Sequence, residues 1–388
     1  MIVRELYKKI EPFFNSPEAI IITGMRRVGK TTLIRYIFEG TASENKIFID
    51  LENPLNRKYF EEENYEKILD HLRFLGIRTD HKAYVFLDEI QFVKNLPSVI
   101  KYLIDHYDIK FFLTGSASFY LKNLFSESLS GRKYVFELFP LSFREFIIMK
   151  DVKLRLPEYN SQITVPVFNE LNRYYDEYLL YGGFPGVVAK ESVKEKAMVL
   201  DDIFSSYFQM EVLQLSDFRK TSVVRDLILL LMGRVGAKLD IQKISKELGI
   251  SRTSIYEYVS FLENTYLIKL IRPFSRSRDT EIRSIPKVFL CDTGLVNHFA
   301  RVSEGALFEN NIFTILRARG EVNYYQKKSG VKIDFILDKK HAFEVKGIPD
   351  PQDMKRLHSL SNELGLEDYK IVSRRYAELK DVVYGFML

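Results

Sequence analysis

The sequence predicts an α/β protein of several domains, and three observations lead to this class. First, residues 18 to 150 alternate short apolar runs with segments of helical period, which is typical of a parallel sheet covered by helices. Second, the pattern from Pro166 to about Met232 is helical and is broken at "YGGFPG". Third, residues 239 to 290 read as helix, turn, helix and strands, and a second, smaller α/β unit follows from about Ala306.

The composition is that of an ordinary globular protein. The chain has 388 residues, of which 46% are hydrophobic and 28% charged. No stretch approaches the roughly 18 consecutive apolar residues of a membrane span. The start, "MIVRELYKKIEPFF", has charges where a signal peptide needs its apolar region. We therefore expect a cytoplasmic protein with no membrane partner.

The net charge and the cysteine content indicate which partners and which kinds of site are compatible with the sequence. A net charge of +5 and a pI near 8.8 are compatible with a nucleic-acid partner but do not require one. The single cysteine, Cys291, excludes an internal disulfide framework and a multi-cysteine zinc site. Its apolar surroundings favour a small buried residue over a reactive thiol.

The loop after the first apolar run has the P-loop pattern, with four residues between two glycines. The glycines let the backbone curl so that N–H groups point at phosphate oxygens, and Lys30 would reach the β and γ phosphates. Thr31 would offer its hydroxyl to Mg²⁺, and the helix that begins there adds its positive dipole end. The predicted cofactors are ATP and Mg²⁺, and the predicted nucleotide site comprises Gly24, Met25, Arg26, Arg27, Val28, Gly29, Lys30, Thr31 and Thr32.

The run "AYVFLDEI" supplies an acidic pair for such a site. Residues 84–87 form a buried strand that delivers Asp88 and Glu89 to its carboxyl end, where ligands bind in open α/β sheets. We expect Asp88 to support Mg²⁺ and Glu89 to polarise the attacking water as general base. The alternative is a pair of solvated carboxylates at a strand end. The acidic pair indicates hydrolysis and not binding alone.

The next apolar run, in "IKFFLTGSAS", ends in hydroxyls at Thr114, Ser116 and Ser118. A polar residue at this position would orient the water or sense the γ-phosphate, and Ser116 is included in the nucleotide site for that reason. The alternative is that these hydroxyls only cap the following helix.

The chain resembles a branch of the AAA+ ATPases over roughly residues 1 to 215. The resemblance rests on "GMRRVGKTTL", "FLDEIQ", "LTGSAS", "SGRKYVFELFPLSFREF" and "LYGGFP". It implies a homo-oligomer in which ATP binds at subunit interfaces and an arginine from a neighbour completes the site. Arg132, in "LSGRK", is the candidate, and the alternative is a plain surface arginine. The roles of Arg26 and Arg27 stay open between phosphate, a neighbouring subunit and solvent.

A helix-turn-helix is predicted in "ISKELGISRTSIYEYVSFLENTYLI". The first helix runs to Leu248, Gly249 forms the turn, and Ser251 is the N-cap of the second helix. The first turns of that second helix are the part of a recognition helix that meets DNA. The predicted DNA contacts there are Arg252, Thr253, Ser254 and Tyr256.

The apolar segments "YLIKLIRPF" and "PKVFLCD", separated by "SRSRDTEIRS", are typical of the wing of a winged-helix domain. From Arg272 to Arg283 four arginines stand against two acidic residues, so the wing is net basic and suited to phosphate contact. Arg276 and Arg278 are the predicted contacts. The alternative is that this domain packs against its neighbours or mediates assembly.

The segment "VKIDFILDKKHAFEVKG" places Asp334 in one strand and Glu344 and Lys346 in the next. Residues two apart in a strand face the same side, so Glu344 and Lys346 project together, and Asp334 joins them if the strands pair. Two carboxylates would hold Mg²⁺, and the lysine would stabilise charge or help to activate water for phosphodiester hydrolysis. A helix with Glu309 precedes the strands and a helix with Gln352 follows them.

This C-terminal order resembles the PD-(D/E)xK nuclease fold, which includes the restriction-endonuclease-like and Holliday junction resolvase groups. The resemblance implies a metal site of Glu309, Asp334 and Glu344 with Lys346 as a catalytic residue. The proline of the motif's name is absent, because Ile333 precedes Asp334. The alternative is a DNA-binding or structural role without cleavage.

The predicted domains are an AAA+ P-loop core (1–150), a helical lid or connector (151–232), a winged helix (233–300) and a nuclease-like domain (301–388). This combination resembles a large prokaryotic AAA+ family over nearly the full length. The first hypothesis is an ATP-driven enzyme that acts on DNA, with branched or Holliday-junction DNA as candidate substrates. The second is a nucleotide-controlled regulator or adaptor whose nuclease-like fold is inert.

Overall fold

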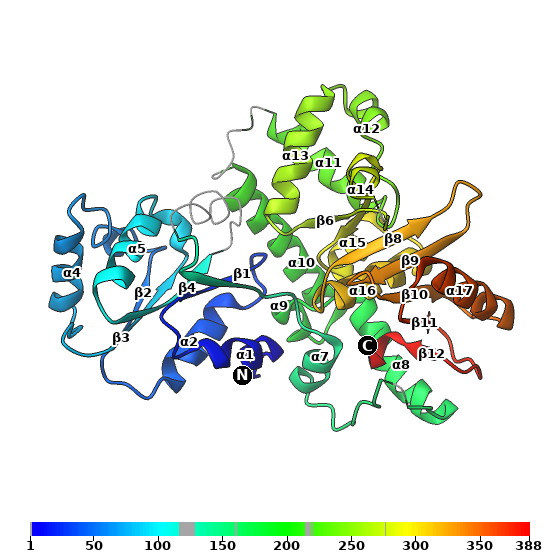
Figure 1. Ribbon diagram of the computed structural model, residues 1–388, viewed down its shortest axis with the longest axis horizontal. Helices are drawn as coiled ribbons and strands as arrows, with labels where there is room; N and C mark the ends of the chain where they lie inside the picture. Colours follow the sequence, from blue (N-terminus) through cyan, green and yellow to red (C-terminus); the bar gives the residue numbers. More distant parts are fainter. Residues whose placement is uncertain (1, 116–128, 160, 214–217, 219, 276) are drawn as a thin grey trace. The chain divides into compact units, whose positions relative to one another are not determined.

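The computed structural model describes residues 2–388 except 116–128, 160, 214–217, 219 and 276. The contacts divide the chain into two compact units (Figure 1). The first contains residues 1–139 and 264–266, and the second contains residues 140–263 and 267–388. The finer division into four domains stays a prediction.

The first unit is built on a five-stranded parallel sheet with the order β2-β3-β4-β1-β5. Strands β1 and β4 are buried along their whole length, which explains why most of their residues are apolar. The expected parallel α/β sheet is therefore confirmed. The strands are β1 (Ala19–Thr23), β2 (Lys46–Asp50), β3 (Ala83–Asp88), β4 (Ile109–Gly115) and β5 (Lys133–Glu137).

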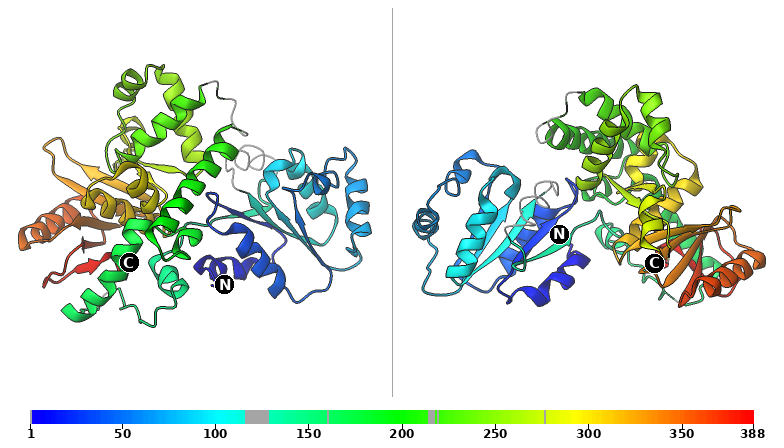
Figure 2. Two further views of the ribbon diagram at one scale, coloured as in Figure 1. Left: turned by 180° about the vertical axis from the view of Figure 1, so that it is seen from behind. Right: turned by 45° about the horizontal axis from the view of Figure 1, so that its top comes forward.

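Helices flank this sheet, and the unit appears in blue to cyan in Figures 1 and 2. Helix α2 (Lys30–Gly40) follows β1 and contacts four strands of the sheet, β1 to β4. Helices α4 (Tyr65–Phe74) and α5 (Leu96–His106) pack together over an apolar core. The shorter helices are α1 (Glu5–Ile10), η1 (Glu11–Phe13), α3 (Pro54–Arg57) and η2 (Ile90–Phe92).

The second unit begins with a helical region, as the pattern predicts. Residues 151–164, apart from the undescribed residue 160, lie outside helices and strands. The break at "YGGFPG" falls between α8 and α9, where the buried Asp292 carboxylate accepts the backbone N–H of Gly183 at 2.7 Å. The helices are α7 (Phe143–Met149), α8 (Val165–Tyr181), α9 (Pro185–Val188), α10 (Val193–Tyr207), the π-helix η3 (Phe208–Leu213), α11 (Thr221–Met232) and α15 (Thr293–Ala300).

The two helices predicted here are present as α12 (Ile241–Leu248) and α13 (Arg252–Asn264). Gly249 ends α12 in the left-handed conformation, with φ of 64°. Ser251 accepts the backbone N–H of Ser254 at 3.0 Å, as expected of an N-cap. The strands β6 (Ile268–Ile271) and β7 (Lys287–Leu290) then pair antiparallel.

The segment between β6 and β7, which the sequence predicts to be a wing, contains the short helix α14 (Arg278–Arg283). Asp279 and Glu281 lie in the first turn of this helix and Arg283 in its last turn. Both placements complement the helix dipole and so favour a helical turn within a charged loop.

A second five-stranded sheet, with the order β12-β11-β10-β9-β8, forms the C-terminal part of this unit, in orange to red in Figures 1 and 2. Strand β9 pairs antiparallel with both β8 and β10, whereas β11 pairs parallel with both β10 and β12. The elements are α16 (Glu304–Arg317), β8 (Val322–Gln326), β9 (Lys332–Leu337), β10 (His341–Lys346), α17 (Pro351–Leu364), β11 (Asp368–Ser373), β12 (Val382–Tyr384) and η4 (Gly385–Met387).

The fold bears on the expected burial of Cys291 and on the question of membrane-spanning helices. Cys291 follows β7 and is buried, as its apolar surroundings predict. Among the described segments, every helix is too short or too polar to span a lipid bilayer.

Candidate functional site

The P-loop joins the carboxyl end of β1 to the first turn of α2. Lys30, the first residue of α2, is buried, and its Nζ donates to the carbonyl oxygens of Gly24 at 2.9 Å and Met25 at 3.0 Å. Gly24 has φ of 139°, and a Cβ at this position would lie 2.2 Å from the carbonyl oxygen of Leu138. Only glycine fits there, so the loop can curl tightly at the amino end of a helix, where an anion is favoured.

The other loop residues differ in their exposure. Met25 and Val28 point into the protein, since both are buried, whereas Arg27 is exposed and has a left-handed backbone with φ of 67°. Arg26 is half-buried and Thr32 is exposed. The apolar members anchor the loop, whereas Arg27 and Thr32 are exposed.

Asp88, the last residue of β3, is buried and meets two hydroxyl groups. The Thr114 hydroxyl on β4 donates to its carboxylate, and the Thr31 hydroxyl on α2 hydrogen-bonds to it as well. Burial raises the pKa of Asp88, although both hydrogen bonds act in the opposite direction. Asp50 is its cross-strand neighbour on β2 and was missed by the sequence reasoning, because it follows an ordinary apolar run.

Glu89 follows β3 and is held in a defined orientation. Its backbone is left-handed, with φ of 56°, which is uncommon for a residue other than glycine. Its backbone N–H lies 3.3 Å from the Thr114 Oγ1, and the buried Gln91 side chain donates to its carboxylate. Thr114 therefore contacts both acidic residues, whereas Ser116 and Ser118 lie outside the described residues. Gln91 is a second residue that the sequence reasoning missed.

Arg132 directly precedes β5 and forms an ion pair within its own chain. Its Nε lies 2.6 Å from the Asp105 Oδ1 on α5, and the two side chains are 38% and 31% exposed. Ion pairs this exposed contribute about 0–1 kcal/mol, so the contact does not hold Arg132 firmly. The action of Arg132 on a neighbour's nucleotide stays a prediction.

The first turns of α13 carry the predicted DNA contacts. Arg252 and Thr253 are exposed, Tyr256 is 61% exposed, and Ser254 is half-buried. The opposite side of the helix packs inward through Ile255 and other apolar residues. Arg278 is the first residue of α14, and Arg276 lies outside the described residues.

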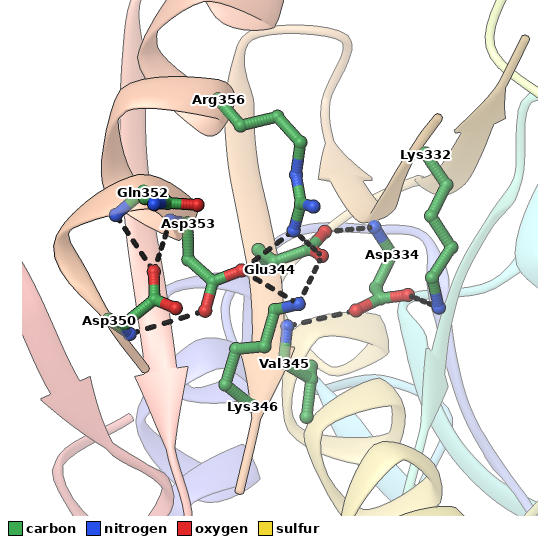
Figure 3. Close-up of polar contacts among 9 residues, drawn as sticks. All are labelled: Lys332, Asp334, Glu344, Val345, Lys346, Asp350, Gln352, Asp353 and Arg356. Atoms are coloured by element: carbon green, nitrogen blue, oxygen red, sulfur yellow. Dashed lines mark hydrogen bonds and ion pairs between the residues drawn. The ribbon is translucent and has the colours of Figure 1, made fainter. Parts of the chain in front are cut away.

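The strand pair β9 and β10 brings Asp334 and Glu344 together (Figure 3). Both residues are 2% exposed, and the Asp334 backbone N–H lies 3.3 Å from the Glu344 Oε2. The Asp334 carboxylate also accepts the backbone N–H of Val345 at 3.0 Å. The expected meeting of the two side chains occurs because the two strands pair antiparallel.

Lysines surround these carboxylates. Lys346 lies 3.4 Å from the Glu344 Oε1 and 3.0 Å from the Asp353 Oδ1 on α17, and Arg356 reaches the same two carboxylates (Figure 3). Lys332 lies 2.6 Å from the Asp334 Oδ1. Lys332, Asp353 and Arg356 were missed, although Lys332 stands two residues before Asp334 on the same strand and so shares its face.

Glu309 on α16 approaches this centre from another element. Its Oε1 lies 3.0 Å from the Lys287 Nζ, and burial raises its pKa in spite of that lysine. Burial and the neighbouring Asp334 carboxylate raise the pKa of Glu344 to about 7. A cavity of about 240 Å³ is lined by Glu309, Asp334 and Lys346, together with Lys332, Arg374 and Arg375 among others.

The predicted metal ligands Glu309, Asp334 and Glu344 lie among basic side chains. Within the described ranges, no group of three or more His, Cys, Asp or Glu side chains is arranged so that it could hold a metal ion. Glu309, Asp334 and Glu344 are each paired with a lysine instead. Gln352 lies in the first turn of α17 and donates its backbone N–H to Asp350 (Figure 3). Mg²⁺ binding at the carboxylates therefore stays a prediction.

Comparison with protein families gives two matches. Residues 16–147 match a family described as "AAA domain", a range that contains the P-loop, the acidic pair and Arg132. Residues 172–306 match a family described as "Domain of unknown function". The first match identifies an AAA domain within the first unit.

Relatives occur in bacteria and archaea. An uncharacterized protein of Haemophilus influenzae is 28% identical, over 98% of this chain and 96% of its own length. An uncharacterized protein of Methanocaldococcus jannaschii is also 28% identical, over 82% of this chain and 71% of its own length. The alignment with the first relative spans both units of the fold.

Similar solved structures include the Aeropyrum pernix ORC1 protein in complex with DNA, with 15% identity and a TM-score of 0.34 over 80% of this chain and 92% of that chain. The C. elegans PCH-2 structure has 15% identity and a TM-score of 0.27, over 66% of this chain and 62% of that chain. These scores are too low to assign a function to this chain.

Proposed function

We propose that this protein hydrolyses ATP with Mg²⁺ and acts on DNA. The observation that carries the proposal is the meeting of Thr31, Asp88 and Thr114, which come from α2, β3 and β4. All three lie at the carboxyl ends of strands or at the helix that follows the P-loop, where a parallel sheet binds its ligand. A buried carboxylate that already accepts hydroxyl hydrogen bonds suits a divalent cation beside the phosphates.

In this proposal the loop from Gly24 to Thr32 binds the phosphates, and Lys30 neutralises their charge. Thr31 and Asp88 would hold Mg²⁺, which when bound would supply further positive charge at the phosphates. Glu89 would accept the proton of the attacking water, because its backbone contact with Thr114 and its side-chain contact with Gln91 hold it in place. Arg132 would act on the nucleotide of a neighbour in a homo-oligomer.

DNA binding is proposed for α13 and the basic segment between β6 and β7. The exposed Arg252, Thr253 and Tyr256 support a role for the first turns of α13. The net charge of +5 supports attraction to phosphates. In this view residues 233–300 form a winged-helix domain and residues 301–388 a nuclease-like domain that engages the same DNA.

Two roles are proposed for the C-terminal carboxylates. Cleavage is supported by the contact of Asp334, Glu344 and Lys346 beside a cavity. The second candidate function is a nucleotide-controlled switch with an inert nuclease-like fold. It is favoured by the ion pairs, because Lys332 and Lys346 already neutralise the two carboxylates without a metal.

One experiment separates these functions. The ATPase rate and the DNA affinity of the full chain are measured against duplex, single-stranded, forked and four-way DNA at several salt concentrations. Salt-dependent binding that is indifferent to sequence, with stimulation by one DNA structure, would support the DNA-processing enzyme. Preference for a short linear operator would support the switch. A protein that neither binds nor hydrolyses ATP would contradict both.

A further inference from the structure

Arg4, in the segment before α1, reaches into the P-loop. The residue is buried, and its Nη1 lies 2.7 Å from the carbonyl oxygen of Val28 inside the loop. Its Nη2 lies 2.7 Å from the carbonyl oxygen of Phe139, which is the last residue of the first unit before the chain enters the second. One guanidinium therefore bridges two backbone segments that are more than a hundred residues apart in sequence.

The contact with Val28 fixes a particular peptide group. The carbonyl of Val28 and the N–H of Gly29 belong to one planar trans peptide, so they point in opposite directions. Holding the carbonyl toward the buried Arg4 directs the Gly29 N–H away from Arg4. A hydrogen bond to a charged donor is about twice as strong as a neutral one, and it polarises the peptide that accepts it.

The other end of the loop is held by Leu138, the neighbour of Phe139. The Leu138 N–H donates to the carbonyl of Thr23 at 2.7 Å, and the backbone of Leu138 packs directly against Gly24. The segment that contacts Arg4 through Phe139 thus also supports the first glycine of the loop. Gly24 and Gly29 are therefore supported by contacts from the N-terminal segment and from residues 138–139.

We propose that Arg4 is a positioning residue of the nucleotide site, which orients and polarises the Gly29 N–H toward the phosphates of a bound nucleotide. The inference rests on the proposed function, because it needs the P-loop to bind phosphate. Arg4 touches no substrate in this account, and it acts only through the backbone of the loop. Arg4 therefore strengthens the binding of the nucleotide phosphates, and the gain in affinity is the same for ATP and for ADP.

Equilibrium binding of ATP, ADP and adenosine to Arg4→Gln tests this role. Lys8→Gln, on the exposed side of α1, is the matched control, because it also removes one positive charge. Loss of a charged hydrogen bond predicts about a tenfold weaker affinity for ATP and for ADP, with unchanged affinity for adenosine, which has no phosphate. The KM for ATP should rise with kcat nearly unchanged, since the interaction is the same in ground and transition states.

Arg4→Lys is the conservative variant. One ammonium cannot reproduce two donors on separate guanidinium nitrogens. We therefore expect the affinity of Arg4→Lys for ATP and ADP to lie between that of Lys8→Gln and that of Arg4→Gln. Hydrogen exchange of residues 24–33 in the nucleotide-free protein should be faster in Arg4→Gln than in Lys8→Gln. If Arg4→Gln does not fold, Arg4→Lys is judged by the same affinities.

The outcomes separate the inference from the proposed function. A wild-type chain that binds no nucleotide removes the proposed function itself. If the wild type and Arg4→Gln bind ADP with equal affinity, only the role of Arg4 is overturned. An equal loss of ATP, ADP and adenosine affinity also overturns it, because that pattern indicates general loosening of the site.

Discussion

The Thr114 hydroxyl donates a hydrogen bond to the Asp88 carboxylate across the neighbouring strands β3 and β4. The same hydroxyl lies 3.3 Å from the backbone nitrogen of Glu89. Thr114 therefore links the residue proposed to support Mg²⁺ to the residue proposed to activate water. This placement favours a role in hydrolysis for Thr114 over the capping role that the sequence left open.

Replacing Thr114 with Val keeps the shape of the side chain and removes the hydroxyl. Asp88 would lose a donor and become harder to ionise, so we expect kcat for ATP hydrolysis to fall about tenfold or more. Thr114→Ser, which keeps the hydroxyl, should recover most of the rate. Steady-state kinetics of the two variants check this. Equal rates for Thr114→Val and the wild type would remove Thr114 from the site.

Replacing Glu89 with Gln should leave a protein that binds ATP but scarcely turns it over. Loss of a general base lowers kcat by about 10²–10⁴-fold, while the affinity for ATP stays close to that of the wild type. Glu63→Gln, an exposed acidic residue of the same unit, is the control. Unchanged hydrolysis in Glu89→Gln would show that another group activates the water.

The central strands of the first sheet could be predicted because their residues are buried on both faces. β1 and β4 contain the apolar runs "AIII" and "FFL", each followed closely by glycine, and runs of this kind predict buried parallel strands. β5, in contrast, is half-buried and mixes Lys133 and Glu137 with aromatic residues, so its pattern carries no clear period. The order of the strands depends on contacts between distant segments, which local patterns do not contain.

The C-terminal site could be predicted only in part. The alternation around Glu344 and Lys346 places them on one face of a strand, and the structure brings Asp334 beside them. The pairing of Lys332 with Asp334 could also have been predicted, because the two residues are two apart in one strand and so share a face. The contacts of Lys346 with Asp353 and of Glu309 with Lys287 join separate elements, and only the packed fold reveals them.

Substitutions in α13 test the proposed DNA surface. Arg252→Ala should weaken binding to all DNA sequences alike and reduce the slope of log K against log salt by about one, as expected when one phosphate contact is lost. Lys194→Ala, exposed on α10, removes the same charge and should leave the slope unchanged. A larger effect from Lys194→Ala than from Arg252→Ala would place the DNA surface elsewhere.

If the C-terminal carboxylates cleave DNA, Asp334→Ala should abolish Mg²⁺-dependent cleavage and leave ATP hydrolysis intact, because the two carboxylate sites belong to separate sheets. Glu378→Ala is the control, since Glu378 and Lys380 have the same Glu-x-Lys spacing and Glu378 is exposed. Gel assays of cleavage beside a phosphate-release assay give both readouts. The hypothesis of cleavage fails if the intact protein never cuts linear, single-stranded or junction DNA with Mg²⁺ or Mn²⁺.

Asp292 predicts a pH dependence of folding. Burial raises its pKa from 3.8 to about 6, although three backbone N–H groups donate to it. Between these pH values the folded state binds more protons than the unfolded state, so the free energy of unfolding falls as pH rises, by about 3 kcal/mol at most. Asp292→Asn cannot titrate, so the stability advantage of the wild type over this variant should shrink from pH 4 to pH 7. Urea unfolding at each pH measures the free energy of unfolding of both proteins. A difference between them that does not change with pH would contradict the prediction.

The central claim is that ATP hydrolysis at the P-loop is coupled to DNA. The most direct measurement is the steady-state ATPase rate of the wild type and of Lys30→Ala, each with and without the DNA structure that binds best. We predict that DNA raises the wild-type rate, that the stimulation declines with salt, and that Lys30→Ala shows no activity in either condition. A wild-type rate that is the same with and without every DNA structure tested would contradict the account.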